Sequence, residues 1–187
     1  MMLSDEQIER YSRQILLPRI GAEGQRTLLC AHARLSGSSA VTTIAGAYLQ
    51  AAGVRVALEA GAPISAENVA VARIATGTDG VSASAASCQV AATFTMARAI
   101  AAVSGDGCWR CALPPAEATA DASAGDVLEP AAAGVAGALQ AYLAVGALLG
   151  ETDRAQRWVF DLERGTVERQ ALAEPPSCSH ARVEVRS

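Results

Sequence analysis

The chain has 187 residues, a length that fits one domain with a sizeable core. Hydrophobic residues make up 51% of the chain but aromatic residues only 4%, so the core must be built from alanine, valine and leucine. The net charge of −4 comes without a basic stripe, which argues against nucleic acid as a partner. The acidic, polar start MMLSDEQIER lacks the basic and apolar regions of a secretion signal and predicts a cytoplasmic protein.

The chain is predicted to begin with a helix that carries a complete capping box. Ser4 is a preferred N-cap residue, Gln7 follows it by three positions, and Pro18 ends the helix. A second, shorter helix is expected over Gly21–Leu29. The spacing of the first helix puts its apolar residues on one face: Ile8, Tyr11, Ile15 and Leu16.

The stretch 34–53, RLSGSSAVTTIAGAYLQAAG, reads as a strand, a tight turn and a helix of a nucleotide-binding type. A phosphate-binding turn of this type needs glycine for the bend, for the close approach of phosphate, and for helix–strand packing. This chain has Gly37, Ser39 and Thr42 at those places. The sequence therefore predicts the scaffold of such a site more firmly than phosphate binding itself, and a purely structural turn is the alternative.

A second strand follows, in which Val54, Val56 and Leu58 alternate up to Glu59. An acidic residue about 20 positions after the first glycine holds the ribose in dinucleotide folds, so Glu59 is a candidate for that role. Periodicity is then lost from 60 to 87, where only Val69–Ile74 is expected to form a short helix or strand. Helical spacing returns over Val90–Val103.

The segment 131–150 contains Gln140 as its only strongly polar residue and is long enough to span a bilayer. Its richness in glycine and alanine and its lack of flanking basic residues predict instead a helix of the core or of a subunit interface, with no membrane involved. Trp158–Leu162 and Val167–Leu172 are predicted to form a β-hairpin.

Several segments together carry a resemblance to the ThiF/MoeB/HesA family, the bacterial relatives of ubiquitin-activating enzymes. The opening LSDEQIERYSRQILLPRIGAEGQ is similar to the N-terminal signature of that family nearly throughout. The degenerate turn with AYLQAAGV, the CWRC sequence, the long apolar segment and WVFDLERGT with PPSC fall in the family's order and spacing. The resemblance implies one α/β, Rossmann-like domain over 1–187, truncated in the middle and ending in a β-hairpin. Its parts are a helical segment (1–30), a βαβ core (34–104) and a C-terminal part (105–187).

Members of this family adenylate the C-terminal glycine of a ubiquitin-like sulfur carrier with ATP and magnesium, as homodimers. This chain departs from their pattern at the ATP site. Only Gly37 remains of the glycine loop, no lysine occurs anywhere, and SCQVAA from Ser87 has no carboxylate where the family has a DCTDN-like magnesium ligand. Arg13 of RYSRQ, in contrast, stands where the resemblance implies an arginine that reaches the partner's ATP.

The resemblance also implies a structural zinc site, of which this chain keeps part. Cys108 and Cys111 form the first ligand pair with the usual spacing. Cys178 remains of the second pair, Ala181 replaces the other cysteine, and His180 is the candidate fourth ligand. The alternative is a pair of free thiols beside a metal-free hairpin.

These features predict a degenerate ThiF/MoeB-like protein that acts as a non-catalytic partner or scaffold in sulfur-carrier activation. It would pair with itself or with a full-length relative. The alternative is an active ATP-dependent adenylyltransferase whose lost residues have been replaced, and a third possibility is a structural metal-binding module.

Overall fold

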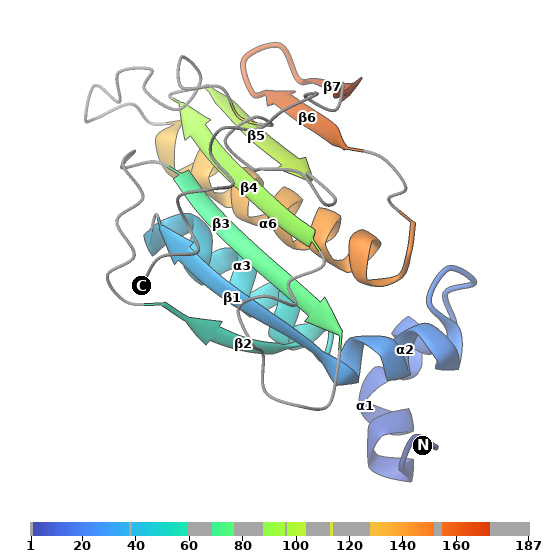
Figure 1. The fold of residues 1–187 in the computed structure, drawn as a ribbon. Coiled ribbons are helices and arrows are strands. Elements are labelled where there is room, and N and C mark those ends of the chain that lie inside the picture. The colour runs from blue at the N-terminus through green and yellow to red at the C-terminus, as the bar shows by residue number, and fades with distance from the viewer. Residues whose placement is uncertain are drawn as a thin grey trace.

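A computed structural model describes residues 2–37, 39–59, 69–76, 88–95, 97–103, 113, 128–151 and 155–172. Seven strands form one mixed sheet in the order β2-β1-β3-β4-β5-β6-β7. Two helices, α3 (Ser39–Ala51) and α6 (Glu129–Leu148), lie side by side on one face of this sheet (Figure 1). The chain is therefore a mixed α/β protein.

The N-terminal helix α1 (Asp5–Ile15) begins as predicted. The Ser4 side chain accepts from the Gln7 backbone, and the Gln7 side chain accepts from the Ser4 backbone, which completes the capping box. The predicted apolar face is only partly buried, because Tyr11 is buried whereas Ile8 is 47% and Leu16 81% exposed. The second helix, α2 (Gly21–Cys30), ends one residue later than expected.

The strands β1 (Ala31–Gly37) and β2 (Arg55–Leu58) are parallel neighbours in the sheet, and α3 connects them in the chain. This confirms the predicted strand–helix–strand beginning. The first strand begins at Ala31, although the stretch that predicted it starts only at residue 34. All other neighbouring strands of the described sheet pair antiparallel. Parallel pairing is thus limited to β1 and β2 in the part of the chain that the structure describes.

Two predictions for the middle of the chain are settled by the strands found there. Val69–Thr76 forms strand β3, so the short element expected there is a strand. The prediction of a helix over Val90–Val103 is wrong, because Cys88–Thr95 (β4) and Arg98–Val103 (β5) are antiparallel strands. The central residues of β4 are buried on both faces of the sheet, and such a strand lacks the alternation that separates strand from helix.

The long apolar segment is a core helix. Among the described residues, one helix, Pro130–Leu148, is long and apolar enough to cross a membrane, and half of it is buried inside the protein. It packs on α3 and on strands β4 and β5. Gln140, the polar residue of this segment, is fully buried and donates from Nε2 to the Val90 carbonyl of β4 at 2.9 Å. The prediction of a core helix is confirmed.

Strands β6 (Gln156–Asp161) and β7 (Thr166–Ala171) form the predicted hairpin at the end of the sheet. The turn is held by Asp161, whose Oδ1 accepts from the Arg164 backbone N–H at 3.0 Å. This hydrogen bond lowers the pKa of Asp161; burial opposes it, and the charge of Arg98, whose Nε lies 3.4 Å from Oδ2, lowers the pKa further.

We expect Asp161→Asn to destabilise the protein in a pH-dependent way. Because the pKa of Asp161 is lower in the folded than in the unfolded protein, the carboxylate stabilises the fold above its unfolded pKa of about 3.9 and loses this contribution as the pH falls through the folded value. Urea unfolding should show a deficit at neutral pH that shrinks below about pH 4. Arg98→Gln, which removes a lesser cause, should show a smaller deficit of the same sign. A deficit that is equal at both pH values would contradict this account.

Candidate functional site

The candidate nucleotide site is the turn between β1 and α3. Gly37 ends β1 with φ +106°, a conformation that side-chain-bearing residues rarely adopt, so the glycine lets the chain reverse into the helix. Ser39 begins α3, and its side chain lies outside the described part of the structure. The N-terminus of α3 follows the turn directly, as it does in phosphate-binding turns.

Thr42 lies in the first turns of α3 and is buried, with 6% of its surface exposed. Close helix–strand packing is achieved one turn later, at Gly46, where an added Cβ would lie 3.3 Å from Leu35 Cδ1 of β1. Gly46 therefore provides the close helix–strand packing that was expected at the third glycine position of the phosphate-binding turn. Sequence reasoning missed this residue. A glycine four residues after Thr42, on the same helix face, was the signal that could have identified it.

Glu59 follows β2 beside the turn, as its proposed role requires. Its backbone N–H donates to the Leu35 carbonyl at 2.8 Å, which fixes the residue at the carboxyl end of the parallel strand pair. Its carboxylate, however, forms an ion pair with Arg34 of β1, with Oε1 3.5 Å from Nη1. A ribose hydroxyl would have to compete with this arginine for Glu59.

The described residues therefore do not fit a bound ATP well. The turn keeps one of three glycines, Thr42 is a buried side chain at the place of the third, and Glu59 has a basic partner of its own. Gly37 ends β1, Ser39 and Thr42 lie at the start of α3, and Glu59 follows β2, which pairs with β1.

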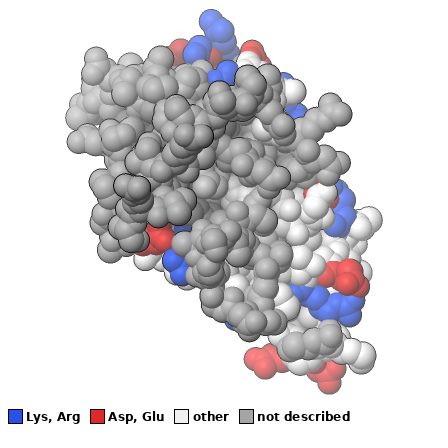
Figure 2. Space-filling view, viewed as in Figure 1, with Lys and Arg blue, Asp and Glu red and all other residues white. Residues whose placement is uncertain are grey.

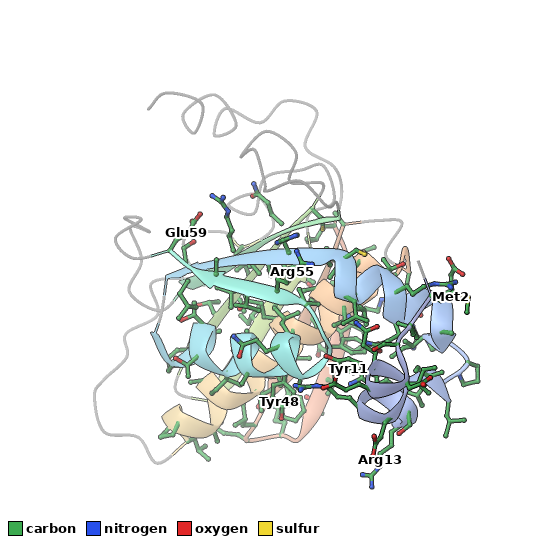
Figure 3. The ribbon with its side chains drawn as sticks, turned by 90° about the horizontal axis from the view of Figure 1, so that it is seen from below. Met2, Tyr11, Arg13, Tyr48, Arg55 and Glu59 are labelled. Carbon is green, nitrogen blue, oxygen red and sulfur yellow. The ribbon has the colours of Figure 1, made fainter. Side chains whose placement is uncertain are left out.

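Arg13 lies at the opposite end of α3. It is exposed on α1, and Figure 3 shows it projecting away from the sheet on the side of Tyr11, far from Glu59. The helix α3 has 13 residues and is about 20 Å long. This length separates its C-terminal end, where α1 packs, from the turn at its N-terminal end. Arg13 therefore cannot contact a ligand at the turn of its own chain.

Two glutamines that sequence reasoning missed hold the N-terminal helices against the end of α3. Gln14 Nε2 donates to the Ala51 carbonyl at 3.1 Å, and Gln25 Nε2 donates to the Ala52 carbonyl at 3.0 Å. The last carbonyls of a helix have no partner within the helix, so these side chains satisfy groups that would otherwise need water. Gln25 is fully buried, and a buried glutamine in a short helix has no sequence signal that separates it from an exposed one.

Basic residues gather on the sheet face that points away from α3 and α6. Ala31, Ala33 and Leu35 of β1 belong to the core, so His32 and Arg34 between them face the other way. Arg55 of β2 is the register partner of His32, and its Nη1 lies 3.5 Å from His32 Nε2. The alternation in AHARLSG could have identified this face.

The four predicted zinc ligands, Cys108, Cys111, Cys178 and His180, lie outside the described residues. Within the described ranges, no three His, Cys, Asp or Glu side chains are grouped so that they could hold a metal ion. The zinc site thus stays a prediction based on the sequence.

We expect purified protein to contain close to one zinc per chain if these four residues form the site. Cys178→Ser should release the metal and His180→Ala should do the same, because a tetrahedral site that loses one protein ligand binds far more weakly. Elemental analysis measures both, with Cys88→Ser, a buried core cysteine, as the control. Zinc that stays in His180→Ala would show that another group is the fourth ligand, and metal-free wild-type protein would contradict the site.

Comparison of the chain with protein-family models and with curated protein sequences gives no match.

Proposed function

We propose that the chain is a shortened ThiF/MoeB-type domain that has lost its own nucleotide site and serves as a non-catalytic partner in the activation of a ubiquitin-like sulfur carrier. In this proposal the β1–α3–β2 unit is what remains of a Rossmann-like half. The partner is a full-length relative or a second copy of the chain.

The observation that carries the proposal is the separation of Arg13 from the turn. The RYSRQ helix keeps its capping box and is held on α3 by the Gln14 amide, so the arginine is presented on an ordered helix. The turn at the other end of α3 has one glycine of three and a glutamate engaged by Arg34. The chain thus combines an arginine that is available to another chain with a site of its own that fits ATP poorly. This combination suits a subunit that completes the site of its partner.

A guanidinium suits this role because it is planar, always charged and able to bind phosphate oxygens with two donors. Where the described surface is visible in Figure 2, basic and acidic side chains lie in small mixed groups instead of a stripe of one sign.

We expect Arg13 to restore activity to a full-length relative that lacks its own RYxRQ arginine. The test mixes that arginine-to-alanine relative with this chain and measures ATP–pyrophosphate exchange in the presence of a carrier protein. Wild-type chain should raise the exchange rate at least about tenfold, in the manner of an arginine supplied in trans. Arg13→Ala should fail to do so, whereas Arg10→Ala, an exposed arginine of the same helix, should succeed.

The same assay on the isolated chain separates this proposal from the alternative of an active adenylyltransferase. We expect no exchange and an affinity for ATP weaker than millimolar, the level at which only about 4 kcal/mol of binding free energy remains. Exchange by the isolated chain with a carrier would favour the active enzyme. Failure of both the isolated chain and the mixture would leave the degenerate partner without support.

A further inference from the structure

We infer that the outer face of helix α1 is an interface at which two copies of the chain associate, antiparallel and about a two-fold axis near Ser12. Three features of the described chain support this, independently of the proposed function. They are the place of the exposed apolar side chains, the order of residues along the outer face of α1, and the charges beside them.

The exposed apolar side chains gather at the N-terminal end of the chain. Among the described residues, eight large apolar side chains are exposed, and half of them lie within the first 17 positions: Met2, Ile8, Leu16 and Leu17. The other four are spread over α3, β2, α6 and β7. Figure 1 shows α1 beyond the edge of the sheet, at the end of the molecule that carries the N-terminus. Single exposed apolar residues are usual on a surface, whereas a group of them marks an interaction site.

Two of these side chains form a row on α1 with a small residue between them. Ile8, Ser12 and Leu16 are spaced by four residues, so they follow one another along the same side of the helix. Leu16 is the C-cap residue and keeps helical backbone angles, with φ −72° and ψ −16°. Ile8 is 47% and Leu16 81% exposed, and Ser12 is exposed as well. Rows of this spacing are the ridges by which helices pack on one another.

This row is complementary to itself when two copies run antiparallel. Ile8 and Leu16 are equally far from Ser12 along the helix. A two-fold axis at Ser12 therefore brings Ile8 of each copy to the height of Leu16 of the other, and both apolar side chains are covered in one contact. Ser12 meets its own counterpart at the crossing, where a small side chain lets the helices approach closely. Such an isologous contact closes at two copies.

The charges beside the row are the reason why the partner is a second copy. Glu9 and Arg13 are exposed on the next row of the same face. Within the described ranges neither forms an ion pair, although a glutamate four residues before an arginine is well placed for one. In the antiparallel pair, Glu9 of one copy and Arg13 of the other lie on the same side of the contact, about 3 Å apart along the helix axis. The two-fold axis generates this pair of opposite charges twice.

The contact is small, because it is formed by one helix of 11 residues from each copy. Stable protein interfaces usually bury at least about 1,200 Å², and weak, transient ones bury less. We therefore expect a Kd on the order of 0.1 mM for the dimer. The chain should be a monomer in dilute solution and a dimer when concentrated.

The test is sedimentation equilibrium of the full chain, from about tenfold below to about tenfold above this Kd. The average mass should rise from that of one chain toward that of two. Leu16→Ser should weaken the association at least about tenfold, because each dimer loses two buried leucines. Leu58→Ser removes a leucine of β2 that is 67% exposed and is the matched control, so it should leave the association unchanged.

A charge exchange tests the antiparallel arrangement itself. Glu9→Arg and Arg13→Glu each place like charges opposite one another in their own dimer, so each variant alone should stay monomeric where the wild type dimerises. An equimolar mixture of the two variants should associate about as well as the wild type, because every opposed pair then has opposite signs. This recovery also shows that both variants are folded.

Three results would overturn the inference: a chain that stays monomeric over the whole range, equal losses in Leu16→Ser and Leu58→Ser, or a mixture of the charge variants that does not associate. The exchange assay of the proposed function uses dilute chain, in which Arg13 is not engaged by a second copy. Glu9→Arg keeps Arg13 and should restore exchange to the relative without associating with itself. Wild-type chain that dimerises but does not restore exchange would contradict the proposed function alone.

Discussion

Gly137→Ala is expected to destabilise the protein by about 1–3 kcal/mol, the usual cost of overpacking a core. Gly137 lies where α6 crosses α3, and a Cβ there would lie 2.8 Å from Ile44 Cβ and 2.9 Å from the Val41 carbonyl oxygen. Real Cβ atoms hardly ever come this close to another heavy atom, and a backbone oxygen cannot rotate away as a side chain can. The two helices would have to move apart.

Gly134→Ala is the matched control, one turn earlier in the same helix. A Cβ at Gly134 meets nothing within 4 Å, so this variant should gain about 0.5–1 kcal/mol from the better helix propensity of alanine. Urea unfolding of the three proteins gives both differences directly. Equal shifts in the two variants would show that α3 and α6 do not approach each other as closely as described.

Gly53→Ala is expected to loosen the N-terminal helices as well as to destabilise the fold. Gly53 follows α3 with φ +99°, and a Cβ there would lie 3.0 Å from Gln25 Nε2 and 3.3 Å from Tyr11 Cζ. The left-handed conformation costs an L-residue about 1–2 kcal/mol, and displacement of Gln25 adds the loss of its hydrogen bond to Ala52.

Gly150→Ala separates the two causes. Gly150 also has a positive φ, +73°, but a Cβ there meets nothing within 4 Å, so this variant carries the backbone strain alone. Urea unfolding should therefore show a larger loss for Gly53→Ala. Trypsin should also cleave after Arg10 and Arg13 faster in Gly53→Ala than in Gly150→Ala. Equal cleavage rates would contradict the idea that the absence of a side chain at Gly53 lets α1 pack against the end of α3.

Local signals in the sequence predicted the elements whose structure is local. The capping box of Ser4 and Gln7, the hairpin around 163–165 and the apolar helix of 131–150 each depend on residues within a few positions of one another. Their formation does not need knowledge of distant partners. The same holds for the turn at Gly37, which a single glycine and a following helix identify.

The features that could not be predicted depend on residues far apart in the chain. Val90–Val103 was expected to be helical because a strand buried on both faces shows no alternation, and only the neighbouring strands reveal it. In the candidate site, the position of Glu59 followed from its distance to Gly37, but its ion pair with Arg34 follows from the pairing of β1 with β2. The contacts of Gln14 and Gln25 with α3 likewise arise only when the chain is folded.

The order of the strands also determines how the sheet can assemble. Strands β6 and β7 are joined by a short turn and can pair early, whereas β5 joins β6 through Val103 and Gln156, with α6 lying between these residues in the chain. Closing so long a loop costs entropy that the β5–β6 ladder repays only once it forms. When α6 packs on β4 and β5, the loop that remains to be closed becomes shorter, because only a few residues separate the C-terminal end of α6 from β6. The late step of folding is therefore expected to be the joining of a preformed hairpin to a sheet that already carries its helix.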